Sequence, residues 1–237
     1  MGRPTRKQQT KNLHEVIKQT AWKEITEKGA SSLSLRAIAR VLKITAPAIY
    51  NYFPRRDDLV TALIVDAFSS LGDSQKKILA SIPASKLEDR LTALGLAYRV
   101  WATKYPQRYH LIFGTPIPGY EAPADVTVPA ASWALVPLIE TIQGLYDMGK
   151  LKTENLAKLT PALNSMLVAW SRFVSQPEAQ VHSEVLYISF VVWSRVHGLV
   201  ALEIGHQNPS FITDPGEVFR REIENIKIQY VIRSENV

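Results

Sequence analysis

The sequence has no cysteine among its 237 residues, and it has no long apolar run. Without cysteine the chain holds no disulfide, no cysteine-bound zinc and no thiol nucleophile, which suits a reducing cytosol. The longest strongly apolar run, Leu186 to Trp193, is far shorter than the about 20 residues that span a membrane. No apolar segment of the signal-peptide kind follows the basic N-terminus. We therefore expect a cytoplasmic protein with no membrane contact.

Catalytic motifs are also missing. The sequence contains no cluster of metal-ligand residues, no nucleophile elbow and no dinucleotide-binding glycine pattern. The segment 144–151 approaches a phosphate-binding loop, but Leu151 occupies the position that needs a hydroxyl group. We expect no enzyme activity, and so no catalytic residue, metal or cofactor. An enzyme or a carrier of hydrophobic molecules ranks last among our hypotheses.

Acidic residues are scarce near the N-terminus. Residues 1–56 contain twelve Lys/Arg and three acidic residues, a net charge of +9, whereas the whole chain carries +6. The remainder is therefore mildly acidic, at −3. A basic N-terminal segment followed by a mildly acidic remainder is typical of proteins that bind the phosphate groups of nucleic acid, although a merely solvated surface would have the same charge.

Period-two alternation is missing too, and helical periodicity dominates, so we expect an all-α fold. We expect an N-terminal three-helix helix-turn-helix domain over residues 1–56, and a larger helical bundle for regulation and dimerisation over residues 57–237. A proline-rich loop is expected at 114–130. The predicted helices cover about 9–28, 56–79, 86–104, 106–113, 131–149, 155–175, 182–205 and 215–234, besides the two short helices of the motif.

Those two short helices lie between Ser34 and Arg56. The hydroxyl residues Ser34 and Thr45 can each cap a helix, and a tight turn at Lys43 separates the two. This is a helix-turn-helix pattern, whose second helix enters the DNA major groove. The spacing turns Ile49 and Phe53 toward the interior.

The pattern resembles the DNA-binding domain of TetR-type repressors. The resemblance covers roughly residues 8–65 and rests on Ser34-x-Arg36-x-Ile38-Ala39 and Thr45-x-Pro47-x-Ile49-Tyr50-x-Tyr52-Phe53. Lysine stands at position 43, where the family usually has glycine, so we expect a left-handed backbone there. The resemblance implies a homodimeric bacterial transcription repressor that binds a pseudo-palindromic operator in double-stranded DNA.

The resemblance also implies which residues contact DNA. Ser34 and Arg36 are expected at phosphates or the groove edge, and Arg56 at a phosphate. The second helix is expected to face the bases with Thr45, Ala46, Ala48 and Asn51, and the backbone with Tyr50 and Tyr52, although Tyr52 also suits the core. A basic arm of Arg3, Arg6 and Lys7 is expected along the backbone or minor groove.

A second, weaker likeness lies near the C-terminus. The segment from Trp193 through His197 and Gly198 to Glu203 resembles the Trp/His/Gly-box of one TetR-type subgroup. The resemblance implies a helix near the dimer interface and beside an effector cavity. His197 is expected to be a packed helix histidine rather than a metal ligand, and close helix approach would explain Gly198, which costs about 1 kcal/mol within a helix.

Two larger sets of apolar residues complete the predictions. The last two helices carry apolar stripes that we expect to pair with a second copy, namely Val185, Ile188, Val192, Val196, Phe219, Ile223, Ile226 and Tyr230. An apolar or amphipathic small effector is expected against aromatic residues that would equally serve as plain core, namely Trp101, Tyr105, Tyr109, Phe113, Trp133 and Trp170. The alternative is a DNA-binding regulator without a small-molecule effector, controlled by a protein partner or acting architecturally.

Overall fold

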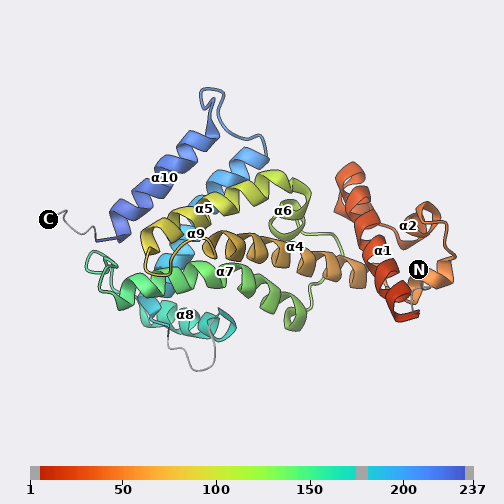
Figure 1. Ribbon diagram of the computed structural model, residues 1–237, viewed down its shortest axis with the longest axis horizontal. Coiled ribbons are helices and arrows are strands. Elements are labelled where there is room, and N and C mark those ends of the chain that lie inside the picture. The colour runs from red at the N-terminus through yellow and green to blue at the C-terminus, as the bar shows by residue number, and fades with distance from the viewer. Residues whose placement is uncertain (1–5, 175–180, 233–237) are drawn as a thin grey trace. The chain divides into compact units, whose positions relative to one another are not determined.

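A computed structural model describes residues 6–174 and 181–232, with side chains from residue 13 onward (Figure 1). In these ranges the regular structure is helical, apart from an isolated bridge between Leu151 and Val231. The helices are α1 (Arg6–Lys28), η1 (Ala30–Ser32), α2 (Leu35–Val41), α3 (Ala46–Tyr50), α4 (Arg56–Leu79), α5 (Leu87–Lys104), α6 (Pro106–Phe113), α7 (Ala124–Asp147), α8 (Pro161–Val174), α9 (Ser183–Ile204) and α10 (Pro215–Tyr230). The expectation of an all-α fold is confirmed.

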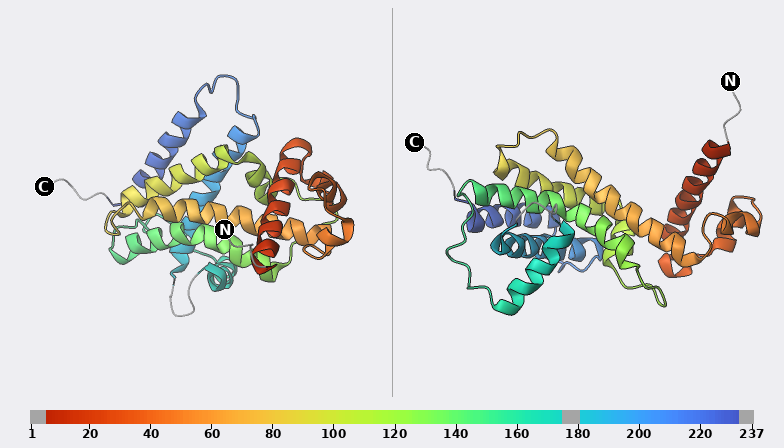
Figure 2. Two further views of the ribbon diagram at one scale, coloured as in Figure 1. Left: turned by 45° about the vertical axis from the view of Figure 1, so that its right-hand side comes forward. Right: turned by 90° about the horizontal axis from the view of Figure 1, so that it is seen from below.

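The chain forms two compact units, which divide it differently from the expected boundary after residue 56. The first unit comprises Met1–Phe68 together with Pro106–Thr127, and the second comprises Ser69–Tyr105 and Val128–Val237. Helix α4 is uninterrupted and contributes residues to both units (Figure 2, right). The segment 106–127 comes from the middle of the chain, yet it belongs with the helix-turn-helix.

The first unit has its own apolar core. Ile17 of α1, Ile38 of α2, Ile49 of α3 and Leu63 of α4 are each fully buried, and Phe53 is 3% exposed. The inward orientation predicted for Ile49 and Phe53 is therefore confirmed. Burying a side chain of this size stabilises a fold by about 1.5–3 kcal/mol, so these four helices hold each other in place.

Polar contacts attach segment 106–127 to this unit. The Tyr120 hydroxyl lies 2.8 Å from the Thr61 hydroxyl of α4. The Arg108 guanidinium of α6 lies 5.2 Å from the centre of the Trp22 ring on α1, within the range of a cation–π contact. These contacts explain why the segment groups with the DNA-binding helices.

The proline-rich loop is shorter than expected, because α7 begins at Ala124. Pro129 and Pro137 lie inside this helix, although proline lacks the N–H that continues a helix and usually kinks or breaks it. Ile139, Ile142 and Leu145 are buried, and this packing offsets the cost. Helix α8, predicted from about residue 155, begins instead at Pro161, where proline suits a first helical turn.

In the second unit, α10 packs along α5 and α9, as Figures 1 and 2 show. Helix α9 is long and apolar enough, by length and composition alone, to cross a membrane. One side of α9 is core, since Val185 and Val200 are fully buried and Ile188 is 1% exposed, whereas Phe190 is 51% exposed. A core helix of a helical bundle has the same composition.

This packing corrects the expected dimer interface. All eight predicted interface side chains are at most 5% exposed within one chain: Val185, Ile188, Val192, Val196, Phe219, Ile223, Ile226 and Tyr230. They contact their own chain, so they have no surface to offer a second copy. A charge at Ile223 would therefore unfold the second unit rather than separate two folded subunits.

Candidate nucleic-acid interface

The turn between α2 and α3 is closed by backbone hydrogen bonds. The Ser34 hydroxyl caps α2 by accepting from the Ala37 amide at 3.4 Å. At the other end, the Ile44 amide donates to the Ala39 carbonyl at 3.0 Å and the Lys43 amide donates to Arg40 at 3.2 Å. This pair of bonds is the Schellman motif, which needs a left-handed residue after the cap. Lys43 supplies it with a φ of 54°, as the sequence predicts.

Replacing Lys43 with glycine should stabilise the first unit. A side chain in the left-handed region is strained, whereas glycine adopts it freely, and we expect a gain of about 0.5–1 kcal/mol. Chemical denaturation of Lys43→Gly and Lys43→Ala will test this, because alanine keeps the strain and serves as the control. Equal stability of the two variants would contradict the expectation.

Helix α3 presents a mixed face to solvent. Thr45, Ala46 and Asn51 are exposed, Ala48 is half-buried and Tyr50 is 38% exposed. The structure gives Thr45 an extended backbone but no side-chain capping bond, so the expected hydroxyl cap at this residue is wrong. The helix begins instead with backbone bonds to the Thr45 carbonyl and with proline in its first turn. The Thr45 hydroxyl therefore makes no cap that would compete with a base or phosphate contact.

The other predicted DNA contacts lie in different surroundings. Arg36 is exposed on α2, whereas Ser34 and Tyr52 are half-buried. Tyr52 packs against the core of the first unit. Arg3 lies outside the described residues, and Arg6 and Lys7 begin α1 but their side chains lie outside the described part.

Arg56 has a contact set that sequence reasoning missed. Its guanidinium donates to the carbonyls of Leu33 at 3.1 Å, Ala30 at 3.2 Å and Ser31 at 3.1 Å. These carbonyls belong to the corner between α1 and α2, and the Arg56 side chain is 29% exposed. Arg56 thus holds the start of α2 against the start of α4, and about a third of it remains open to a phosphate.

Comparison with known proteins identifies the chain. A family model described as "Bacterial regulatory proteins, tetR family" matches residues 17–63, and "Tetracyclin repressor-like, C-terminal domain" matches residues 91–226. The chain belongs to the TetR family. The helix-turn-helix transcriptional regulators Rv1816 of Mycobacterium tuberculosis and Mb1846 of Mycobacterium bovis are each 32% identical over 198 residues, which is 83% of this chain and 83% of theirs.

Solved structures agree with this assignment. The crystal structure of the protein SCO4313 superposes with a TM-score of 0.76 at 33% identity, covering 94% of this chain and 98% of that one. A Rhodococcus sp. RHA1 protein of unknown function superposes with a TM-score of 0.71 at 18% identity, covering 93% and 96%, and shares the fold. The protein is a TetR-family helix-turn-helix transcriptional regulator, and its family and relatives are transcriptional regulators rather than enzymes.

The predicted effector residues of this TetR regulator do not all belong to one unit. Tyr109 and Phe113 lie in the first, with ring centres 5.3 Å apart. Trp101 lies in the second, is 2% exposed, and its indole N–H donates to the Ser70 hydroxyl at 3.0 Å. Its ring centre is 6.4 Å from that of Tyr105. The Trp101 side chain is therefore buried in the core of the second unit, and its N–H already has a hydrogen-bond partner.

The two remaining tryptophans lie nearer the surface of the second unit. Trp170 is half-buried on α8. Trp133 is 41% exposed and lines an open groove of about 550 Å³ between α7 and α8. The Lys76 ammonium lies 2.9 Å from the centre of the Trp133 ring, which makes a cation–π contact.

The centre of the second unit contains a narrow cavity that sequence reasoning missed. It has a volume of about 30 Å³ and is lined by residues of α4, α5, α7, α9 and α10. Val192, Val196, Ile223 and Ile226, expected at a dimer interface, line this cavity instead. Gln75 on α4 also lines the cavity. In the sequence Gln75 is a polar residue within an otherwise apolar stripe of the helix, and this was the signal that could have indicated the cavity.

His197 lies near the cavity, where it is hydrogen-bonded to Tyr98. Its Nδ1 is 2.8 Å from the hydroxyl of Tyr98, which lines the cavity. Its ring stacks on Trp193 with centres 4.8 Å apart. Burial lowers the pKa of His197 below its ordinary 6.5, because desolvation disfavours the imidazolium. A neutral, hydrogen-bonded histidine agrees with the packed role expected from the sequence.

Proposed function

We propose that this TetR regulator is a dimeric repressor in the bacterial cytoplasm, released from a pseudo-palindromic operator by a small, largely apolar effector. The exposed face of α3, on a segment with a net charge of +9, carries the proposal. Thr45, Ala46 and Asn51 are small or hydrogen-bonding residues that suit base edges, and Arg36 supports them with a phosphate contact. A two-fold dimer presents two such helices, which requires inverted half-sites.

The dimer surface we propose is the exposed face of α9 and α10. Phe190 and Leu202 are 51% and 39% exposed, and Gly198 lies between them in the same row of α9. Apart from its chain neighbours and the backbone of its own helix, an added Cβ at Gly198 would meet no atom of the described residues within 4 Å. Nothing in this part of the chain therefore explains a glycine there, whereas close approach of a second copy would. Such a contact would agree with the position near the dimer interface that the resemblance implies for the segment from Trp193 to Glu203.

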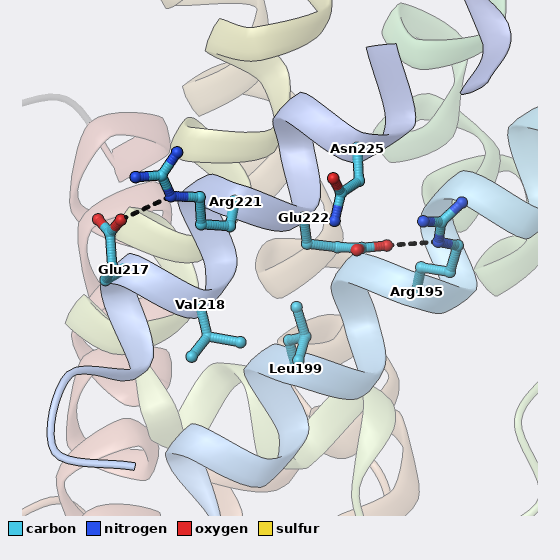
Figure 3. Close-up of a pocket in the computed structure, with 7 residues that line it drawn as sticks. All are labelled: Arg195, Leu199, Glu217, Val218, Arg221, Glu222 and Asn225. Carbon is cyan, nitrogen blue, oxygen red and sulfur yellow. Dashed lines mark hydrogen bonds and ion pairs between the residues drawn. The ribbon is translucent and has the colours of Figure 1, made fainter. Parts of the chain in front are cut away.

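A groove of about 520 Å³ lies between the same two helices (Figure 3). Leu199 of α9 and Val218 of α10 supply its apolar floor, and ion pairs between Arg195 and Glu222 and between Arg221 and Glu217 flank it. A row of paired charges around apolar side chains matches the composition of a subunit interface, with its apolar centre and polar rim.

The effector part of the proposal is supported by the cavity at the centre of the second unit. Ligand sites in helical bundles lie between helices and are mostly apolar, as this cavity is. The alternative function, a regulator without a small effector, predicts that no small molecule changes operator affinity.

Substitutions in α2 and α3 test the DNA-binding assignment. Arg36→Ala should weaken binding to all DNA sequences alike and lower the log–log salt slope by about 0.9 per subunit, because it removes one phosphate contact from each subunit of the dimer. Asn51→Ala and Ala48→Ser should change base preference at single positions, by about 1–3 kcal/mol per base pair. Operator selection followed by fluorescence anisotropy at several salt concentrations measures both effects.

Arg40→Ala is the matched control, because Arg40 is also exposed on α2 but is expected to be a solvated charge. Selected sites without inverted symmetry would contradict the dimeric model. A change in base preference caused by Arg36→Ala, with none caused by Asn51→Ala, would reverse the assigned roles.

A further inference from the structure

Gln75 is an unsatisfied polar residue in the core of the second unit. Its side chain is on α4, it is 6% exposed, and its Oε1 has no hydrogen-bond partner within the described part of the chain. A buried oxygen that loses its water and gains no donor destabilises the fold, so such groups are rare and call for an explanation. An apolar residue would fill the same place at lower cost.

The surroundings of this oxygen restrict what can bind it. No charged residue lines the cavity, whose walls include Leu91, Leu94, Leu138 and Trp193. An ion would be stripped of water without compensation there. A water molecule fits the volume of about 30 Å³, but a buried water needs two to four polar partners. Apart from Gln75, the lining side chains that carry a polar atom are Tyr98, whose hydroxyl is engaged with His197, and Trp193. A mostly apolar molecule with a single donor matches both the walls and the oxygen.

The cavity can enlarge at Gly95 on α5. This glycine has no side chain, and the Cδ1 of Ile223 on α10 occupies the place where a Cβ would stand. Rotation of the Ile223 side chain would open that space to a ligand. Gln75 lies on the same helix as Arg56, which holds the start of α2, so occupation of the cavity acts on a helix that reaches the DNA-binding motif.

We propose that the effector is a neutral, largely apolar molecule with one O–H or N–H donor, and that Gln75 Oε1 accepts its hydrogen bond. This proposal rests on the proposed ligand response and names the chemistry of that ligand. It excludes carboxylates, phosphates and ammonium ions as effectors.

The first experiment needs no ligand. Gln75→Met keeps the shape of the side chain but removes the oxygen, so it should raise the melting temperature of the ligand-free protein by about 2–4 °C. Gln143→Met is the matched control: Gln143 lies on α7 outside this cavity, where it bonds Asp147 at 2.7 Å, and no such increase is expected. An unchanged or lower melting temperature for Gln75→Met would mean that the oxygen has a partner in solution, which overturns the proposal.

The second experiment uses the isomers 1-octanol and methyl heptyl ether, of which only the alcohol has a hydrogen-bond donor. Calorimetry should show at least about tenfold tighter binding of octanol by the wild type, and no preference by Gln75→Met. Equal binding of both probes, failure of octanol to bind, or a preference that survives in Gln75→Met overturns the proposal. Operator release is measured separately by anisotropy, so octanol that binds without releasing DNA would refute the ligand-responsive function and leave the Gln75 site standing.

Discussion

Gly198→Leu should convert the dimer to folded monomers and abolish tight operator binding. In one chain the site is open, and leucine favours a helix over glycine by about 0.8–1 kcal/mol, so the subunit itself should be slightly more stable. Against a second copy the same side chain overfills a close contact, at about 1–3 kcal/mol, and two-fold symmetry applies this cost twice. Dimer dissociation should therefore increase about 30-fold or more.

Analytical ultracentrifugation measures the dissociation constant, and circular dichroism checks that helix content is retained. Thr103→Leu is the control, because Thr103 is exposed and belongs to α5 rather than to α9 or α10. If Gly198→Leu remains as dimeric as the control and only gains thermal stability, the interface lies on another surface.

Arg56→Ala is expected to lower both the stability of the first unit and its affinity for every DNA sequence. It removes a charged group that donates to three carbonyls, and hydrogen bonds to charged groups contribute about 1.5–3 kcal/mol each without being additive. We expect a loss of about 2–3 kcal/mol in unfolding free energy. Hydrogen exchange should rise in the corner between α1 and α2, since that corner loses its support.

Two comparisons separate this supporting role from a simple phosphate contact. Arg56→Lys keeps the charge, but its donors sit on a single nitrogen, whereas arginine reaches the three carbonyls from Nε and Nη2, so it should restore little of the lost stability. Arg36→Ala should weaken DNA binding with no loss of stability, since Arg36 is exposed. Full recovery of operator binding by Arg56→Lys, with unchanged hydrogen exchange in Arg56→Ala, would show that the charge alone matters.

Much of the first unit was predictable because its signals are local. Helix periodicity, the cap at Ser34 and the position of Lys43 in a tight turn each depend on residues within one or two turns of the chain. The same local rules failed at Thr45, where proline in the first turn and the backbone replace a side-chain cap. They also failed at the start of α7, where the stabilisation from burying Ile139 and Ile142 outweighs the cost of the two prolines inside the helix.

The sequence by itself determined the all-α fold, the helix-turn-helix and the face of α3 that turns outward. Tertiary structure alone decided that the apolar stripes of α9 and α10 meet their own chain, that segment 106–127 joins the first unit, and that Gln75 Oε1, beside a cavity, has no hydrogen-bond partner among the described residues. Periodicity shows which side of a helix is apolar, but a stripe that packs on its own chain and one that packs on a second copy have the same period. The partner of each stripe depends on contacts between residues far apart in the chain, and those exist only once the helices are packed.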